Sequence, residues 1–206
     1  MKKVNKIIMI ILFFIFCVMA VLVHFGLTGS FDAAVYNFVI GLRSDLLTKV
    51  LLFITEFASV KGIVFLCAVS LIGLFWKHYK SLFLVLNVIV STIFNVVIKN
   101  IMMIPRPNIL RLTDETGYSF PSGHSMASVA FYGFIIYLLL SSNMNKYLKV
   151  VISSLLVILI IVIGFSRVYL GVHNVSDVVA GFALSTGLLL ADIMILKKRG
   201  LIKWKR

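Results

Sequence analysis

Three short polar blocks interrupt an otherwise apolar chain, and they contain the residue types that could carry out chemistry. In order along the sequence they are Lys99 with Arg106-Pro107, then Pro121-Ser122-Gly123-His124, then Ser166-Arg167 with His173 and Asp177. Cations can hold phosphate oxygens, a histidine can attack phosphorus or transfer a proton, and a carboxylate can orient a histidine. The blocks therefore predict a site for phosphoryl transfer that needs no metal ion or other cofactor.

The first block offers two cations at the end of a predicted helix. Lys99 and Arg106 are seven residues apart, about two helical turns, so they share a face if the helix continues to Ile104. Pro105 then ends the helix, and a planar guanidinium beside a compact ammonium suits phosphate oxygens. Two cations at a helix end are also ordinary interfacial anchors, so this pair alone does not decide between the two roles.

The second block predicts the start of a helix. Ser122 is suited to cap it, Gly123 permits a close backbone approach, and the free N–H groups of the first turn favour a bound anion. His124 lies in that turn and can give a proton to a bound group. The alternative for this block taken alone is an ordinary capped helix with an interfacial histidine.

The third block places a carboxylate one helical turn after a histidine. On a helix, Asp177 would accept a hydrogen bond from Nδ1 of His173, which leaves Nε2 unprotonated and able to attack phosphorus. Arg167, six residues before His173, supplies a third cation. The alternative is a structural pair, in which the two side chains only satisfy each other inside the membrane.

The composition predicts an all-α membrane protein. Of the 206 residues, 61% are hydrophobic and 13% are charged, and the mean hydropathy is +1.10, beyond what a water-soluble core of this size buries. A membrane-spanning helix needs about 20 mostly apolar residues. A bundle of six such helices is predicted, over residues 7–25, 51–75, 81–104, 125–142, 148–166 and 177–196. The short connections favour one domain over residues 1–206, with the motif region at 99–177.

The net charge of +13 could suggest nucleic-acid binding, but the distribution of charge indicates a membrane topology instead. With a cytoplasmic N-terminus, the cytoplasmic side carries most basic residues, namely Lys2, Lys3, Lys6, Lys77, Lys80, Lys146, Lys149, Lys197, Lys198, Arg199, Lys203, Lys205 and Arg206. This asymmetry follows the positive-inside rule and predicts a multi-pass plasma-membrane protein with both termini in the cytoplasm. All three polar blocks then emerge on the extracytoplasmic face, which predicts one active site at the membrane interface.

Several other features leave alternatives open. The first apolar stretch could be a cleavable signal peptide, although its length and the lack of a small-residue cleavage site favour an uncleaved span. Residues 31–50 suit either an interfacial helix or a connecting loop. Asp114 and Glu115 could pair with a nearby arginine or belong to a solvated loop. Glu56 and Lys61 could bound the pocket or simply lie at the interface.

Together the blocks resemble the three-part signature of the type 2 phosphatidic acid phosphatase superfamily. Lys-x6-Arg-Pro, Pro-Ser-Gly-His and Ser-Arg-x5-His-x3-Asp are all present, in order and with the expected spacing, between residues 99 and 177. The six predicted spans are similar to those of the membrane lipid phosphatases in this family. Among these, the bacterial phosphatidylglycerophosphatases B and undecaprenyl pyrophosphate phosphatases are the most similar groups.

The resemblance implies a role for each signature residue. His173 would be the nucleophile that forms a phosphohistidine, Asp177 would orient it, and His124 would act as general acid and base. The phosphate-binding residues that it implies are Lys99, Arg106, Ser122, Gly123 and Arg167. No metal ion or other cofactor is expected.

The resemblance also implies a substrate, a lipid phosphate or diphosphate that enters from the bilayer. Undecaprenyl pyrophosphate leads, followed by phosphatidylglycerophosphate and phosphatidic acid. One alternative is a membrane transporter of lipid or anion, which would be expected to place polar residues near the middle of the membrane. Another is a vanadate-dependent haloperoxidase, because those enzymes share the signature. No nucleic-acid partner is expected, and the oligomeric state stays open.

Overall fold

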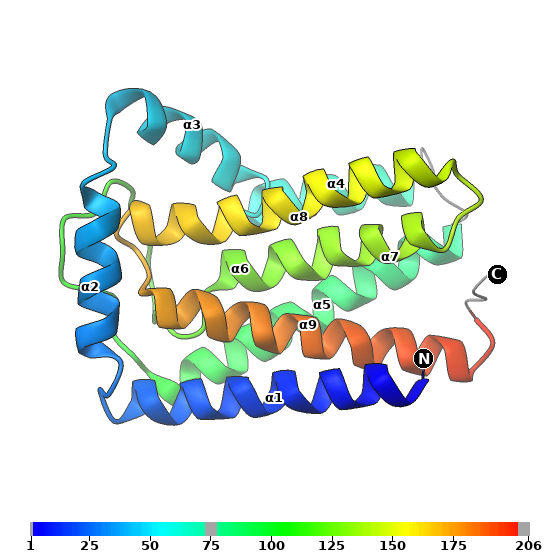
Figure 1. Cartoon of the computed structure of the whole chain (residues 1–206), viewed down its shortest axis with the longest axis horizontal. Helices are drawn as coiled ribbons and strands as arrows, with labels where there is room; N and C mark the ends of the chain where they lie inside the picture. The colour runs from blue at the N-terminus through cyan, green and yellow to red at the C-terminus, as the bar shows by residue number, and fades with distance from the viewer. Residues whose placement is uncertain (1, 73–77, 202–206) are drawn as a thin grey trace.

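The computed structural model describes residues 2–72 and 78–201, and the described chain consists of helices and the loops between them. In order, the elements are α1 (Lys2–His24), α2 (Gly29–Ile40), α3 (Asp45–Glu56), α4 (Val60–Leu71), α5 (His78–Met102), α6 (Gly123–Ser128), a π-helical segment (Val129–Gly133), α7 (Phe134–Leu140), α8 (Lys146–Tyr169) and α9 (Val175–Lys198). The long helices lie side by side in a bundle, and α1 packs along α9 (Figure 1). The segment from α6 to α7 is one continuous helical rod.

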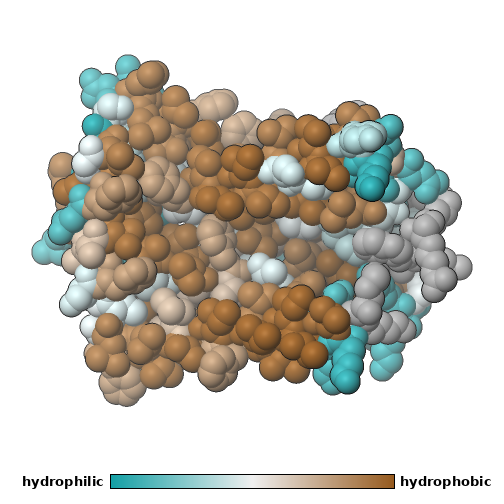
Figure 2. All heavy atoms as spheres, in the orientation of Figure 1, coloured by the Kyte–Doolittle hydropathy of each residue, from teal (hydrophilic) through white to brown (hydrophobic). Residues whose placement is uncertain are grey.

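The bundle has the dimensions and surface of a membrane protein. Five helical segments among the described residues are long and apolar enough to cross a bilayer, and a sixth results when α3 and α4 are counted as one bent span. Apolar side chains cover the middle of the molecule, whereas hydrophilic side chains gather at its two ends (Figure 2). The prediction of an all-α, multi-span membrane protein is confirmed.

The second predicted span, residues 51–75, is not one straight helix. The chain breaks between α3 and α4, and the two helices meet at a bend of 48°. Ser59 caps α4 by accepting a hydrogen bond from the Gly62 amide at 3.0 Å. A Cβ atom at Gly62 would lie 1.9 Å from the carbonyl oxygen of Glu56, so only glycine permits this tight turn. The predicted positions that lie outside the described residues are 73–75, Lys77, Lys203, Lys205 and Arg206.

The expectation that the third helix continues to Ile104 is wrong, because α5 ends at Met102. Met103 has a φ of 50°, in the left-handed region that a helix cannot use. Ile104 precedes Pro105, and a residue before proline is disfavoured in helical geometry. Arg106 therefore lies in the loop of residues 103–122 rather than on the same helical face as Lys99.

The arrangement of the helices brings the three polar blocks to one end of the bundle. The end of α5, the start of α6, the end of α8 and the start of α9 all lie at the end of the bundle opposite to the start of α1 and the end of α9 (Figure 1). Helix α2 runs across that same end, so residues 31–40 are helical rather than a connecting loop, while residues 45–50 already belong to α3. The prediction that all three blocks share one face of the membrane is consistent with this geometry.

Candidate active site

The buried pair of His173 and Asp177 forms the centre of the site. Nδ1 of His173 lies 3.3 Å from Oδ2 of Asp177, and both side chains are almost fully buried. His173 precedes the helix, and α9 begins at Val175 after its N-cap, Asn174. The same Oδ2 accepts a hydrogen bond from the Asn174 amide at 3.0 Å. The contact that the four-residue spacing predicts is therefore present, although it is made at the helix start rather than along a helix face.

The neighbours of His173 fix which ring nitrogen carries the proton. Nη1 of Arg106 lies 3.2 Å from Nε2, and a guanidinium can only donate, so Nε2 is the acceptor and Nδ1 carries the hydrogen. Burial lowers the pKa of His173 to about 4, helped by the charges of Arg106 and Lys99 and opposed by Asp177. The imidazole is therefore neutral at pH 7, with its Nε2 lone pair directed away from Asp177.

The loop of residues 103–122 wraps around two of the cations and holds them by its carbonyl oxygens. Arg106 donates from Nε to the carbonyl of Gly117 at 3.1 Å and from Nη2 to that of Thr116 at 2.9 Å. It also donates to the carbonyl of Val172 at 2.9 Å, beside His173. Lys99, on α5, donates to the carbonyls of residues 118 and 119. Arg106 thus reaches the site although it does not share a helix with Lys99.

Glu115 lies among the cations, where a bound anion would be expected. Its Oε1 accepts a hydrogen bond from Nη2 of Arg167 and lies 3.9 Å from Nδ1 of His124, while Oε2 lies 3.6 Å from Nη2 of Arg106. Arg167 is 1% exposed, and its Nη1 donates to Oγ1 of Thr55 at 2.9 Å. Of the two alternatives for Glu115, pairing with an arginine of the site is the one that the structure shows.

The second block starts a helix as predicted. Oγ of Ser122 caps α6 by accepting from the Ser125 amide at 3.4 Å, and it accepts from Oγ of Ser125 at 2.9 Å. Asn95 on α5 donates to the carbonyl of Pro121 at 2.9 Å. A Cβ atom at Gly123 would lie 3.2 Å from Oδ1 of Asn95, so the glycine allows α5 to approach the block closely. Ser122 is fully buried, and its hydroxyl is occupied within the protein.

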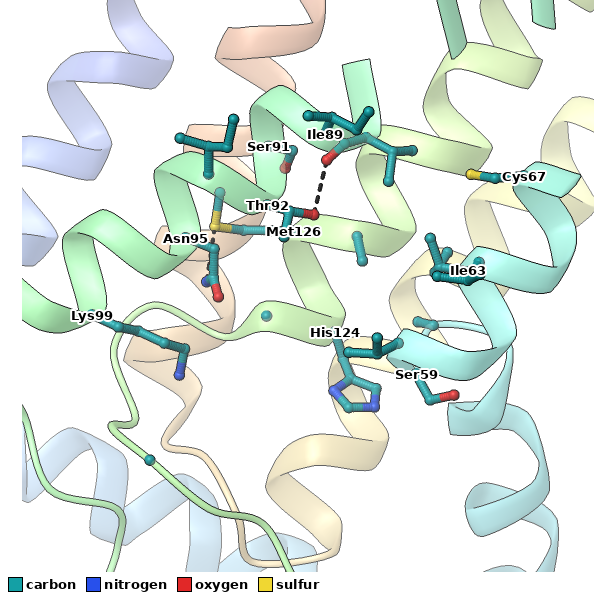
Figure 3. Close-up of a pocket in the computed structure, with 18 of the residues that line it drawn as sticks. Ser59, Ile63, Cys67, Ile89, Ser91, Thr92, Asn95, Lys99, His124 and Met126 are labelled. Carbon is teal, nitrogen blue, oxygen red and sulfur yellow. Dashed lines mark hydrogen bonds between the residues drawn. The ribbon is translucent and has the colours of Figure 1, made fainter. Parts of the chain in front are cut away.

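An elongated cavity of about 710 Å³ begins at this site and continues between α4 and α5. Its polar end is lined by Lys99, Arg106, Glu115, His124 and His173, and its apolar walls include Ile63, Cys67, Val88, Ile89 and Ile93. Lys99 and His124 point into one end of it, whereas Cys67 and Ile89 lie toward the other (Figure 3). Of the remaining predicted site residues, Gly123 lines the cavity, whereas Ser122, Arg167 and Asp177 lie behind its wall.

Sequence reasoning missed several polar side chains that hold the site in place. Asp32 on α2 accepts from the Ser176 amide at 3.0 Å and from the Ser176 hydroxyl at 2.8 Å, at the start of α9. Ser119 contacts both His173 and Asp177. An aspartate within a largely apolar segment was a usable sequence signal for Asp32. The serine, by contrast, offered none, because serines are common in loops.

The comparison with known families decides the identity of the chain. The profile of the PAP2 superfamily matches residues 80–200, which is more than half of the sequence and includes all three blocks. The chain belongs to the PAP2 superfamily. This confirms the resemblance that the three-part signature indicates.

Individual relatives agree with the PAP2 assignment. The PAP2 chain is 34% identical over 185 residues to phosphatidylglycerophosphatase B of Bacillus subtilis (strain 168). The aligned region covers 87% of this chain and 89% of that relative. A crystal structure of a transmembrane PAP2-type phosphatidylglycerolphosphate phosphatase from Bacillus subtilis superimposes with a TM-score of 0.84 at 30% identity, over 96% of this chain and 98% of that one. Dolichyldiphosphatase of Saccharomyces cerevisiae is 36% identical over 126 residues, 56% of this chain and 53% of the yeast protein.

The PAP2 chain is thus a membrane lipid phosphatase, a hydrolase of phosphoric esters. Its fold is that of the transmembrane PAP2 phosphatases.

Replacing Glu115 tests whether its carboxylate occupies an anion site. In Glu115→Gln, an oxyanion such as vanadate no longer has to displace a negative charge from the cations, so we expect it to bind about 3- to 10-fold more tightly. Titration calorimetry of the purified protein in detergent measures this. Asp114→Asn is the matched control, because Asp114 forms no ion pair with any residue in the described part of the chain. Weaker vanadate binding in Glu115→Gln would mean that the carboxylate assists the anion instead.

Proposed function

We propose that this protein removes a phosphoryl group from a lipid phosphate or diphosphate through a phosphohistidine intermediate, without a metal ion. The observation that carries the proposal is the shape of the cavity. Its polar end contains a neutral histidine and two cations, and its long apolar part lies between α4 and α5. A lipid suits both parts, because its acyl or prenyl chain can lie against the apolar walls while its phosphate contacts the cations.

In the first step, Nε2 of His173 attacks phosphorus while the bond from phosphorus to the leaving oxygen breaks. Arg106, which donates to Nε2, must turn toward a phosphate oxygen for the lone pair to become free. Asp177 accepts from Nδ1 and stabilises the positive charge that develops on the ring. His124 gives a proton to the leaving oxygen, so the lipid departs as an alcohol or, from a diphosphate, as a monophosphate.

In the second step, water attacks phosphorus and the bond between phosphorus and Nε2 breaks. His124, now neutral, accepts the proton of the water, and inorganic phosphate leaves. Lys99, Arg106 and Arg167 supply the positive charge that stabilises the phosphoryl oxygens in both steps. Arg167 can contribute once the incoming group replaces Glu115. Among the described residues, no group of three His, Cys, Asp or Glu side chains is placed to hold a metal ion.

Two lipid substrates have specific support. Undecaprenyl pyrophosphate is the first candidate, and the similarity to dolichyldiphosphatase supports a polyprenyl diphosphate. Phosphatidylglycerophosphate is the second, and the match to phosphatidylglycerophosphatase B over most of both chains supports it. Beyond the polar end, the cavity walls are mainly apolar, and the described lining residues include no second cluster of cations. The walls therefore suit either a prenyl or an acyl chain.

Phosphate release from these two lipids and from phosphatidic acid tests the proposed chemistry. Purified protein in detergent is expected to release phosphate in the presence of EDTA and to be inhibited by vanadate. We expect His173→Ala to lower kcat by about 1000-fold or more, because the nucleophile is lost. His24→Ala, at the end of α1, is the control and should retain full activity. Strict dependence on magnesium, or near-normal turnover by His173→Ala, would contradict the mechanism.

The pH dependence follows from the lowered pKa of His173. Because burial lowers that pKa to about 4, the ring stays neutral as the pH falls from 8 to 5, and protonation removes the nucleophile only near pH 4. On the acid side, we therefore expect kcat/KM to fall only near pH 4. It should not fall near pH 6.5, where an ordinary histidine becomes protonated. The measurement is kcat/KM from pH 4 to pH 8, and assay after return to pH 7 shows that the protein survived. An acid limb centred near 6.5 would show that His173 is more exposed than the structure indicates.

We also propose that the site faces the extracytoplasmic side and that both termini are cytoplasmic. The support is the asymmetry of charge between the two ends of the bundle. The starts of α1, α5 and α8 and the end of α9 lie together at the end of the bundle opposite to the site (Figure 1). The basic residues in and next to these segments are Lys3, Lys6, Lys80, Lys146, Lys149, Lys197, Lys198 and Arg199, an enrichment typical of cytoplasmic ends.

A cysteine in the loop of residues 103–122 tests this orientation. In intact cells, Thr113→Cys is expected to react with a maleimide that cannot cross membranes. The wild type is the control for its own cysteines, Cys17 and Cys67, both of which lie in helices. Labelling of Thr113→Cys only after the cells are permeabilised would reverse the proposed topology.

A further inference from the structure

Ser119 contacts both members of the histidine–aspartate pair from outside the three polar blocks. Its hydroxyl donates to Oδ2 of Asp177 at 2.5 Å, and its Oγ lies 3.2 Å from Nδ1 of His173. Because Nδ1 also lies 3.3 Å from the same Oδ2, the three polar atoms form a closed triangle. The Nδ1 hydrogen can therefore be shared between the serine and the carboxylate.

The single proton of the serine hydroxyl determines how this triangle works. When the Ser119 hydroxyl donates its hydrogen bond to Asp177, the oxygen of Ser119 presents lone pairs toward Nδ1 and can accept a hydrogen bond from it. This arrangement requires the tautomer of His173 with hydrogen on Nδ1, which the donation from Arg106 to Nε2 also requires. The two contacts on opposite sides of the ring thus select the same state, with Nε2 unprotonated.

The backbone of Ser119 is held by Lys99 on α5 and by Ile104, just after that helix. Its amide donates to the carbonyl of Ile104 at 2.8 Å, and its carbonyl accepts from Nζ of Lys99 at 3.2 Å. The residue is fully buried, so its side chain has no alternative partner in solvent. Ser119 therefore connects Lys99 of the first block to His173 and Asp177 of the third block.

Asp177 depends on this hydroxyl because its other donors are few. Oδ2 accepts from Ser119, His173 and the Asn174 amide, whereas the buried Oδ1 has no hydrogen-bond partner among the described residues. Loss of the serine donor would leave the carboxylate free to turn about its last torsion, and the imidazole would turn with it. The nucleophilic Nε2 would then point less accurately at phosphorus, and misplacement of this kind slows attack.

We infer that Ser119 is a positioning residue, whose hydroxyl holds the Asp177 carboxylate and the His173 ring in the orientation for attack. This inference rests on the proposed function, since it assigns to His173 the role of nucleophile. Ser119 itself neither touches the phosphoryl group nor transfers a proton to it.

Kinetics of three single variants test the role. Ser119→Ala removes the hydroxyl, and Ser119→Cys keeps the shape of the side chain, with a slightly larger atom, but offers only a weak donor. We expect both to lower kcat by about 10- to 100-fold with a change in KM below about threefold, as for a lost hydrogen bond to a charged group. Ser128→Ala is the control, because Ser128 is equally buried and bonds only to the Ser125 carbonyl, at 2.9 Å. Wild-type activity in Ser119→Cys, or equal activity in Ser119→Ala and Ser128→Ala, would overturn the inference.

A double-mutant cycle separates action through Asp177 from an independent effect. In an Asp177→Asn background, Ser119→Ala is expected to change kcat by less than about twofold, because the carboxylate that it orients is already gone. If the two losses multiply instead, Ser119 does not act through Asp177, and the inference is wrong.

Anion binding provides a readout that does not depend on knowing the lipid. Vanadate forms a five-coordinate species on a histidine that resembles the transition state, whereas inorganic phosphate resembles the bound product. In Ser119→Ala, calorimetry should show about tenfold weaker vanadate binding and phosphate binding within twofold of wild type. Equal weakening of both, or no change in either, would contradict the role of Ser119. Failure of the wild type to bind vanadate or to hydrolyse any lipid would instead overturn the proposed function.

Discussion

The buried carboxylate of Asp177 is the group on which the rest of the site depends. Its Oδ2 accepts hydrogen bonds from the Asn174 amide, from His173 and from Ser119, so one oxygen joins the start of α9, the histidine and the loop of residues 103–122. A negative charge in an apolar interior is costly unless donors reach it, and the N-terminus of a helix is one of the few places that favours it. The position of Asp177 therefore follows from the start of α9, and the histidine follows from Asp177.

The second constraint is the balance of charge around an apolar cavity. Lys99, Arg106 and Arg167 lie at the end of the bundle that contains the site. Unpaired cations would be costly in these partly buried positions. Carbonyl oxygens of residues 116–119 and the carboxylate of Glu115 compensate this positive charge within the protein. In the proposed mechanism a substrate phosphate replaces the Glu115 carboxylate. Its affinity would then depend on how much more strongly the cations bind the phosphate than the carboxylate.

Much of the fold could be predicted, because a long apolar stretch must become a helix inside a bilayer. The breaks in the helices could not. The bend between α3 and α4 depends on the close approach of Gly62 to the carbonyl of Glu56, and the early end of α5 depends on the backbone of Met103. Such local geometry is set by packing around the turn. The apolar pattern continues through both positions, and Pro105 marks a boundary near the end of α5 without fixing the residue at which the helix ends.

The sequence by itself determined the three polar blocks, their placement at one end of the bundle and the contact between His173 and Asp177. These follow from chain order and from the four-residue separation of His173 and Asp177 at the start of α9, which are local properties. Only the tertiary structure decided what lies between the blocks. Asp32, Thr55, Glu115 and Ser119 reach the site from α2, α3 and the loop, because folding brings donors and acceptors to charges that burial would otherwise leave unpaired. Those partners are distant in sequence and ordinary in type, so only their contacts reveal them.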